Sequence, residues 1–184
     1  MIDIKEVLNN SGGRMLSTGA EGLYKACMEI QAKSIVEIGS MDGGSTCVLG
    51  DAARENDGHL FSVEPNPKQR ARANIEKYQL EKFITHIFHA SPWVPIEKIK
   101  LPIDLIFIDG DHRTRWEIVD YHYWEKYVRV GGLIAFHDIC GRKGVKDWVW
   151  RGLNIILEDD AHKLKEYARY EGPDRGTIIF QKIA

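Results

Sequence analysis

The sequence predicts an α/β fold in which helices cover both faces of a doubly wound, mainly parallel sheet. From Ser34 onward, short apolar runs alternate with longer amphipathic stretches, which is the pattern of this architecture. A glycine-rich segment follows the first apolar run, and a turn-rich connector separates the last two. The chain has 184 residues, of which 43% are hydrophobic, enough for one core but too few for two ordinary domains. We therefore expect a single domain over residues 1–184.

Apolar runs give the expected strands. Ile35–Ile38 and Leu105–Ile108 are almost continuously apolar, as strands covered on both faces are, so we expect them at the centre of the sheet. Lys163–Tyr170 and Thr177–Lys182 flank the connector Glu171–Gly176 and predict a C-terminal antiparallel hairpin. The five expected parallel strands are Ser34–Ile38, His59–Val63, Ile84–His89, Ile103–Ile108 and Gly132–His137. Together these runs predict a seven-stranded sheet.

Two helices are expected to begin shortly after strands. Asn66 and Pro67 supply an N-cap and a first helical residue, which predicts a helix through about Gln79. Thr114 and Glu117 have the spacing of a capping box at the start of a second helix.

Residues 1–33 precede the first strand and are expected to form an N-terminal helical segment. Leu23, Cys27 and Ile30 are spaced to share one buried helix face. The simpler interpretation is that these helices pack against the core formed by residues 34–184. The alternative is that they form a lid over the substrate.

Charge and cysteine content name no macromolecular partner. The 25 basic and 27 acidic residues nearly cancel, so we expect no nucleic-acid or membrane partner.

Cys27, Cys47 and Cys140 lie far apart and lack the close spacing of structural zinc sites, which fits reduced thiols. No segment has the apolar length of a signal-peptide core or of a membrane span. We therefore expect a cytoplasmic protein.

The glycine-rich segment after the first strand predicts a ligand-binding turn at the start of a helix. Gly39, Gly43 and Gly44 would let a ligand approach bare backbone. A dinucleotide-binding turn needs a second glycine two residues after the first, and Met41 stands at that position. The turn therefore disfavours a nicotinamide cofactor and suits a smaller ligand without a pyrophosphate.

Glu64 ends the second expected strand. A carboxylate at this place accepts hydrogen bonds from both hydroxyls of a ribose. The alternative is a carboxylate that favours the N-terminus of the helix beginning near Asn66. Together with the glycine turn, Glu64 indicates an adenosine-containing ligand.

Five motifs together resemble the class I S-adenosylmethionine-dependent methyltransferases, within the branch of catechol O-methyltransferase and other small-molecule methyltransferases. The resemblance extends from Ser34 to about Ile139, and it implies a Rossmann-like sheet and transfer of a methyl group. The motifs are Val36–Ser40, Val63–Glu64, Ala90–Ser91, Phe107–His112 and Gly131–Asp138.

The resemblance also implies a complete site for S-adenosylmethionine. Its methionine end would lie at the glycine turn, its ribose at the end of the second strand and its adenine just past the third. A turn cap is the alternative role of Ser91. The implied cofactor-binding residues are Glu37, Gly39, Ser40, Ser45, Glu64, Ala90, Ser91 and Asp109.

On the acceptor side, the resemblance implies a divalent metal, Mg²⁺ or Mn²⁺, bound by Asp109, His137 and Asp138. This sequence has a histidine where the branch carries a carboxylate, and Mg²⁺ prefers an all-oxygen shell. An imidazole with two carboxylates suits manganese, iron or zinc better. Alternatively, His137 acts as a base with no metal present.

His112 stands where the catechol-type enzymes carry the lysine that removes the acceptor proton, and an imidazole can do the same work. The expected catalytic residues are thus His112, Asp109 and His137. The alternative is that His112 belongs to a polar lead-in to the helix at Thr114. Because methyl transfer is a direct displacement, the protein mainly aligns the reactants and deprotonates the acceptor, so we expect O-methylation of a small-molecule hydroxyl.

The sequence allows alternatives for the function, the oligomeric state and the acceptor pocket. A noncatalytic S-adenosylmethionine-binding protein and a nicotinamide-dependent oxidoreductase are alternative functions, and a homodimer that completes the acceptor pocket is an alternative to a monomer. The loop Ile139–Gly144 either closes over the acceptor or is simply solvated. Tryptophans 93, 116, 148 and 150 either line an aromatic acceptor pocket or pack in the core.

Overall fold

A seven-stranded sheet organises the part of the chain that the computed structural model describes, residues 1–12, 15–140, 148–172 and 175–184. Its order is β3-β2-β1-β4-β5-β7-β6; β1 to β5 are parallel, and β7 runs antiparallel to both neighbours. The strands are β1 Ser34–Ile38, β2 His59–Val63, β3 Ile84–Ile87, β4 Ile103–Ile108, β5 Val128–His137, β6 Leu164–Glu171 and β7 Gly176–Lys182. The Rossmann-like sheet with its C-terminal hairpin is confirmed.

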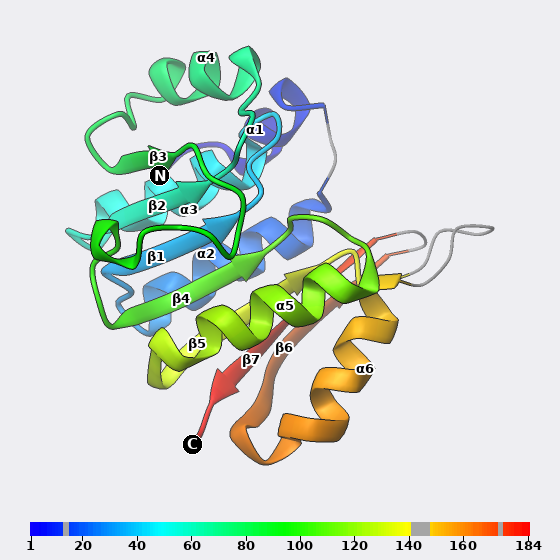
Figure 1. Ribbon diagram of the computed structural model, residues 1–184. Coiled ribbons are helices and arrows are strands. Elements are labelled where there is room, and N and C mark those ends of the chain that lie inside the picture. Colours follow the sequence, from blue (N-terminus) through cyan, green and yellow to red (C-terminus); the bar gives the residue numbers. More distant parts are fainter. Residues whose placement is uncertain (13–14, 141–147, 173–174) are drawn as a thin grey trace.

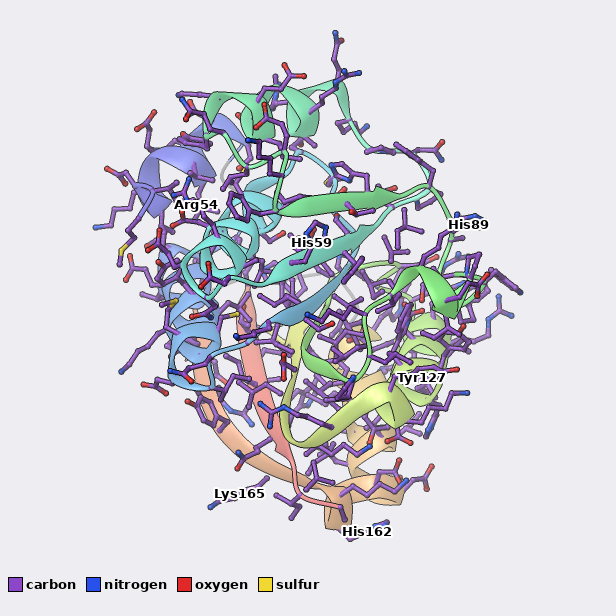
Figure 2. All side chains as sticks on the ribbon, turned by 90° about the vertical axis from the view of Figure 1, so that its left-hand side faces the viewer. Arg54, His59, His89, Tyr127, His162 and Lys165 are labelled. Carbon is purple, nitrogen blue, oxygen red and sulfur yellow. The ribbon has the colours of Figure 1, made fainter. Side chains whose placement is uncertain are left out.

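Helices cover both faces of this sheet, with α5 and α6 in front of it and α2 behind it in Figure 1. Figure 2 shows the same layering from the side, with Arg54 of α3 and Tyr127 after α5 on opposite sides of the strands. The α-helices are α1 Ile4–Asn10, α2 Ser17–Glu29, α3 Gly44–Glu55, α4 Gln69–Lys77, α5 Thr114–Trp124 and α6 Trp148–Asp160. Short 3₁₀ helices are η1 Ile96–Lys98, η2 Glu125–Tyr127 and η3 Ala161–Lys163.

Strand β4 shows how the two layers share one sheet. Leu105 and Phe107 belong to the core under α1, α2 and α3, whereas Ile106 and Ile108 belong to the core under α5 and α6. Successive side chains of a strand point to opposite faces, so a run that is apolar at every position serves both cores. This is why the continuous apolar runs predicted the central strands correctly.

The strand order places a crevice above β1 and β4. From β1 the chain proceeds outward to β2 and β3, and then returns to pair β4 on the other side of β1. The connections on the two sides of this point leave the sheet in opposite directions, so the carboxyl ends of β1 and β4 face a gap that can bind a ligand. The expected site residues follow these strand ends.

The predicted start of α4 is wrong. The helix begins at Gln69, with Lys68 and not Asn66 at its N-cap. The backbone amide of Asn66 instead donates to Oε1 of Glu64 at 3.0 Å. The loop after β2 is therefore organised by a local contact with the Glu64 carboxylate, two residues earlier in the chain, and not by an Asn66 cap.

The predicted capping box at α5 is wrong as well. Thr114 is already helical, Arg113 is the N-cap, and the Thr114 hydroxyl donates to the carbonyl oxygen of Trp148 at 2.9 Å. Glu117 is buried, and its side chain packs beside Gly152 of α6. Both side chains of the predicted box thus serve the contact between α5 and α6.

The N-terminal segment forms the two helices α1 and α2, which pack on one face of the sheet. Leu23 and Cys27 are fully buried, as their spacing predicted. Among the helices of the described ranges, none combines the length and the apolar character needed to cross a membrane.

We predict that Leu105→Ala lowers the free energy of unfolding by about 2–5 kcal/mol, because it opens a cavity at a fully buried position of the central strand. Urea denaturation measures the change. Val130→Ala, at a side chain that is 62% exposed on β5, should change the same quantity by less than about 0.5 kcal/mol. Equal losses in the two variants would contradict the assignment of β4 to the core.

Candidate active site

A cavity of about 780 Å³ opens at the carboxyl ends of β1, β2, β4 and β5 and brings most of the predicted residues together. Its size is that of a site for a small molecule or cofactor. The lining includes, from the predicted set, Gly39, Ser40, Ser45, Glu64, Ala90, Ser91, Asp109, His112, His137 and Asp138. Glu37 is the member of that set absent from the lining.

Gly39 is required by the close approach of β1 and β4. Its φ is +88°, and a Cβ built there would lie 2.2 Å from the carbonyl oxygen of Asp109. A side chain would therefore be both strained and in collision. The glycine lets the turn after β1 lie directly against the first residue after β4.

Glu37 acts from below the cavity. It is fully buried, and its carboxylate accepts hydrogen bonds from Ser45 Oγ at 2.6 Å, Thr46 Oγ1 at 2.7 Å and Ser62 Oγ at 2.7 Å. Burial raises the pKa of Glu37 to about 7, although these three hydroxyls stabilise its charged form. Of its partners, Ser45 lines the cavity. Glu37 thus positions Ser45 and the first turn of α3 from outside the cavity lining.

Glu64 is fixed beside the glycine turn. Its Oε2 accepts from the backbone amides of Ser40 at 3.3 Å and Met41 at 3.5 Å, and its Oε1 accepts from Asn66. An ionised carboxylate has about four acceptor positions, so these contacts leave room for donors from the cavity. The arrangement holds a negative charge at the end of β2, where sequence analysis expects a ribose.

Ser91 connects the loop after β3 to α5. Its Oγ accepts from Nε1 of Trp124 at 2.7 Å, and its hydroxyl lies near the carboxylate of Asp120. Burial raises the pKa of Asp120 to about 6, and the Ser91 hydrogen bond opposes this shift. Asp120 is only 3% exposed, yet it lines the cavity.

The two histidines and two carboxylates of the predicted acceptor side lie within a few ångströms of one another. Nδ1 of His137 lies 3.0 Å from Oδ1 of Asp109 and 3.4 Å from Oδ1 of Asp138. Nε2 of His112 lies 3.6 Å from Oδ2 of Asp138 and 3.8 Å from Oδ1 of Asp109. His137 is buried, whereas the His112 side chain is 43% exposed. Of the two rings, His112 is therefore the one accessible to a substrate.

Electrostatics distinguish the buried members of this group. Burial alone would lower the pKa of His137, but the carboxylates of Asp109 and Asp138 outweigh it, so the pKa lies above its ordinary value. Burial raises the pKa of Glu117 well above its ordinary value, and the neighbouring carboxylates of Asp120, Asp109 and Asp138 add to this shift. The carboxyl groups of Asp109, Asp120 and Asp138 thus line the cavity, and Glu117 lies close to them.

The ring of His137 has one paired and one unpaired nitrogen. Nδ1 lies at hydrogen-bond distance from Asp109, and Nε2 is buried with no hydrogen-bond partner among the described residues. Within residues 1–12, 15–140, 148–172 and 175–184, no three His, Cys, Asp or Glu side chains are grouped so that they could hold a metal.

Sequence reasoning missed part of the cavity wall. Asp120 was not expected there, since a buried carboxylate breaks an apolar pattern. Leu8, Ser11 and Met15 of the N-terminal segment also line the cavity, which agrees with the alternative that this segment covers the substrate, although they carry no motif. Trp93, Trp116 and Trp148 line the cavity, as one of the two interpretations held. Residues 141–144 of the loop Ile139–Gly144, which was a candidate lid, lie outside the described residues.

Residues 36–139 match the profile of a protein family described as a methyltransferase domain. A curated relative, the uncharacterized protein R132 of Acanthamoeba polyphaga mimivirus, is 28% identical over 112 residues, which is 56% of this chain and 50% of that protein. The chain thus matches about half the length of that relative.

Solved structures share the fold over nearly the whole chain. An O-methyltransferase from Bacillus cereus, in complex with SAH, has a TM-score of 0.76 at 22% identity, covering 99% of this chain and 92% of that one. The O-methyltransferase TomG from Streptomyces achromogenes, in complex with SAM, has a TM-score of 0.74 at 16% identity, covering 99% and 91%. At these identities the likeness concerns the fold.

The buried Glu37 predicts a pH dependence of stability. Its pKa of about 7 lies above that of an unfolded glutamate, so the native state retains this proton to higher pH than the unfolded state. The resulting stabilisation is fully present below about pH 4.5 and is lost as the pH rises through about 7. We expect the stability of the wild type to decline from pH 5 to pH 8 relative to Glu37→Gln, measured by urea denaturation. The exposed Glu81→Gln variant is the control, and parallel curves for wild type and Glu37→Gln would refute the raised pKa.

Proposed function

The chain belongs to the methyltransferase domain family, and on this premise we propose that it transfers the methyl group of S-adenosylmethionine to a hydroxyl of a small molecule. One observation carries the proposal. The glycine turn with Glu64 and the His112, Asp109 and Asp138 side chains line the same cavity. A cofactor and an acceptor bound there would lie side by side, which is the main requirement of a direct displacement.

The cofactor lies along the ends of β1, β2 and β3 in this proposal. Ser40, Ser45 and the start of α3 bind its methionine end, where the helix N-terminus favours a carboxylate. Glu64 accepts hydrogen bonds from the ribose hydroxyls. Ala90 and Ser91 contact the adenine. Asp109 lies between the cofactor and the acceptor.

His112 is the general base of the proposed reaction. The acceptor hydroxyl gives its proton to Nε2 of His112 while its oxygen forms a bond to the methyl carbon. The bond between the methyl carbon and sulfur breaks, its electron pair stays on sulfur, and the sulfonium becomes a neutral thioether. The charged imidazole that results faces Asp138 at 3.6 Å and Asp109 at 3.8 Å, which stabilise it.

The proposed reaction uses His112 as the base and needs no divalent metal, and Asp109 lies at hydrogen-bond distance from Nδ1 of His137. His137 is instead a positioning residue that holds the Asp109 carboxylate toward the cavity. We also propose a cytoplasmic location, since Cys27, Cys47 and Cys140 are free thiols of the kind that a reducing compartment maintains.

Calorimetric titration with S-adenosylhomocysteine tests the cofactor site. We expect micromolar binding to the wild type and, for Glu64→Ala, affinity lower by about ten- to a hundredfold, since hydrogen bonds to a charged group are lost. Addition of Mg²⁺ or Mn²⁺ should leave the wild-type affinity unchanged. Glu97→Ala, a substitution on η1 outside the cavity lining, is the matched control. Absence of wild-type binding would refute the proposed function.

Replacement of the base tests the chemistry. His112→Gln should lower kcat by about 10²–10⁴-fold and leave S-adenosylhomocysteine affinity unchanged, because the imidazole acts on the acceptor. The rate is measured as S-adenosylhomocysteine release with a panel of phenols, sugars and aliphatic alcohols. His89→Gln, in the loop after β3 but outside the cavity lining, should retain full activity. Cofactor binding without turnover of any acceptor would favour a noncatalytic binding protein.

A further inference from the structure

Two polar atoms on the cavity side of α5 lack hydrogen-bond partners in the described part of the chain. Trp116 and Asp120 are four residues apart, so they lie one above the other on the same helix face, and both line the cavity. Nε1 of Trp116 and Oδ1 of Asp120 are buried, and neither finds a partner among the described residues. One of these atoms is a donor and the other an acceptor.

Unpaired polar atoms of this kind are costly. A buried donor or acceptor without a partner loses its hydrogen bonds to water and gains none in return, and a charged one loses more. Neighbouring residues hold both groups in place without satisfying them. Trp93 packs edge-on against the Trp116 ring at 5.8 Å, and the Ser91 hydroxyl lies near the Asp120 carboxylate. A fixed acceptor beside a fixed donor is a preorganised site for a complementary ligand edge.

The position of this pair in the cavity indicates which part of a nucleoside it would meet. Glu64 marks the ribose position at the end of β2, and the loop carrying Ser91 and Trp93 comes next along the sheet edge, at the end of β3. The face of α5 with Trp116 and Asp120 lies against that loop. A base attached to a ribose at Glu64 would therefore reach α5.

Adenine has the complementary pattern. Its exocyclic 6-amino group is a donor, and a ring nitrogen that accepts a hydrogen bond lies beside it. We propose that Asp120 accepts a hydrogen bond from the 6-amino group and that Nε1 of Trp116 donates to the adjacent ring nitrogen, so that α5 selects an adenine nucleoside. This inference rests on the proposed function, because it places the adenosyl part of the cofactor in this cavity.

A base with oxygen at position 6 would be rejected. Hypoxanthine presents a carbonyl oxygen where adenine presents its amino group, and this oxygen would face the carboxylate of Asp120 without a donor between them. Two acceptors in a buried site leave both groups unpaired. The residue pair therefore acts on specificity for the base, and not only on overall affinity.

The test compares two ligands, S-adenosylhomocysteine and S-inosylhomocysteine, by calorimetric titration of the full chain. Wild type should prefer the adenosyl ligand by about ten- to a hundredfold. In Asp120→Asn this preference should fall by at least about tenfold, because the amide nitrogen can donate to the oxygen at position 6. Trp116→Phe retains the ring and removes the donor, and should weaken adenosyl binding by about two- to tenfold.

Asp111→Asn is the matched control, since Asp111 lines the same cavity but pairs with Arg113 on the exposed side. Its preference for the adenosyl ligand should equal that of the wild type. Measurable binding of either ligand shows that each variant is folded. An unchanged preference in Asp120→Asn, or equal wild-type affinity for the two ligands, would overturn the inference and leave the methyltransferase proposal intact. Failure of the wild type to bind either ligand would instead refute the proposed function.

Discussion

The close contact between the turn after β1 and the end of β4 determines the architecture of the site. The backbone amide of Asp109 donates to the carbonyl oxygen of Ile38 at 2.9 Å, and Gly39 leaves no side chain between the two segments. Because of this contact, the turn proposed to hold the methionine end of the cofactor borders the group around Asp109. A bulkier residue at Gly39 would separate them, and a direct displacement tolerates little misalignment.

Sequence patterns predicted the features that depend on burial over a whole element. The apolar runs of β1 and β4 can only be central strands, and the chain order then brings Glu64, Asp109 and His137 to one edge of the sheet. Site residues at strand ends were therefore predictable in position. Gly39 was predictable in type, because a strand-to-helix turn against a ligand needs bare backbone.

Features decided by tertiary contacts were not predictable. Asn66 and Thr114 have the residue types of helix caps. The backbone amide of Asn66 instead donates to Glu64, and the side chain of Thr114 donates to the carbonyl oxygen of Trp148. Glu37 belongs to a ligand-binding motif, yet three hydroxyls from α3 and β2 engage it below the cavity. Asp120 carried no signal, because a buried acid in a helix resembles an exposed one in sequence. The partner of Thr114 lies 34 residues away and those of Glu37 lie 8 to 25 residues away, whereas Glu64 is only two residues from Asn66.

The acidic character of the site is consistent with chemistry that starts from a cation. S-adenosylmethionine carries its positive charge on sulfur, and this charge disappears when the methyl group leaves. In the proposed reaction the acceptor proton moves to His112, so a positive charge reappears on the imidazole, facing Asp109 and Asp138. The net charge of the cavity is thus the same before and after transfer. Fixed carboxylates that stabilise a charge moving only a short distance need little reorganisation, which is how preorganised sites lower barriers.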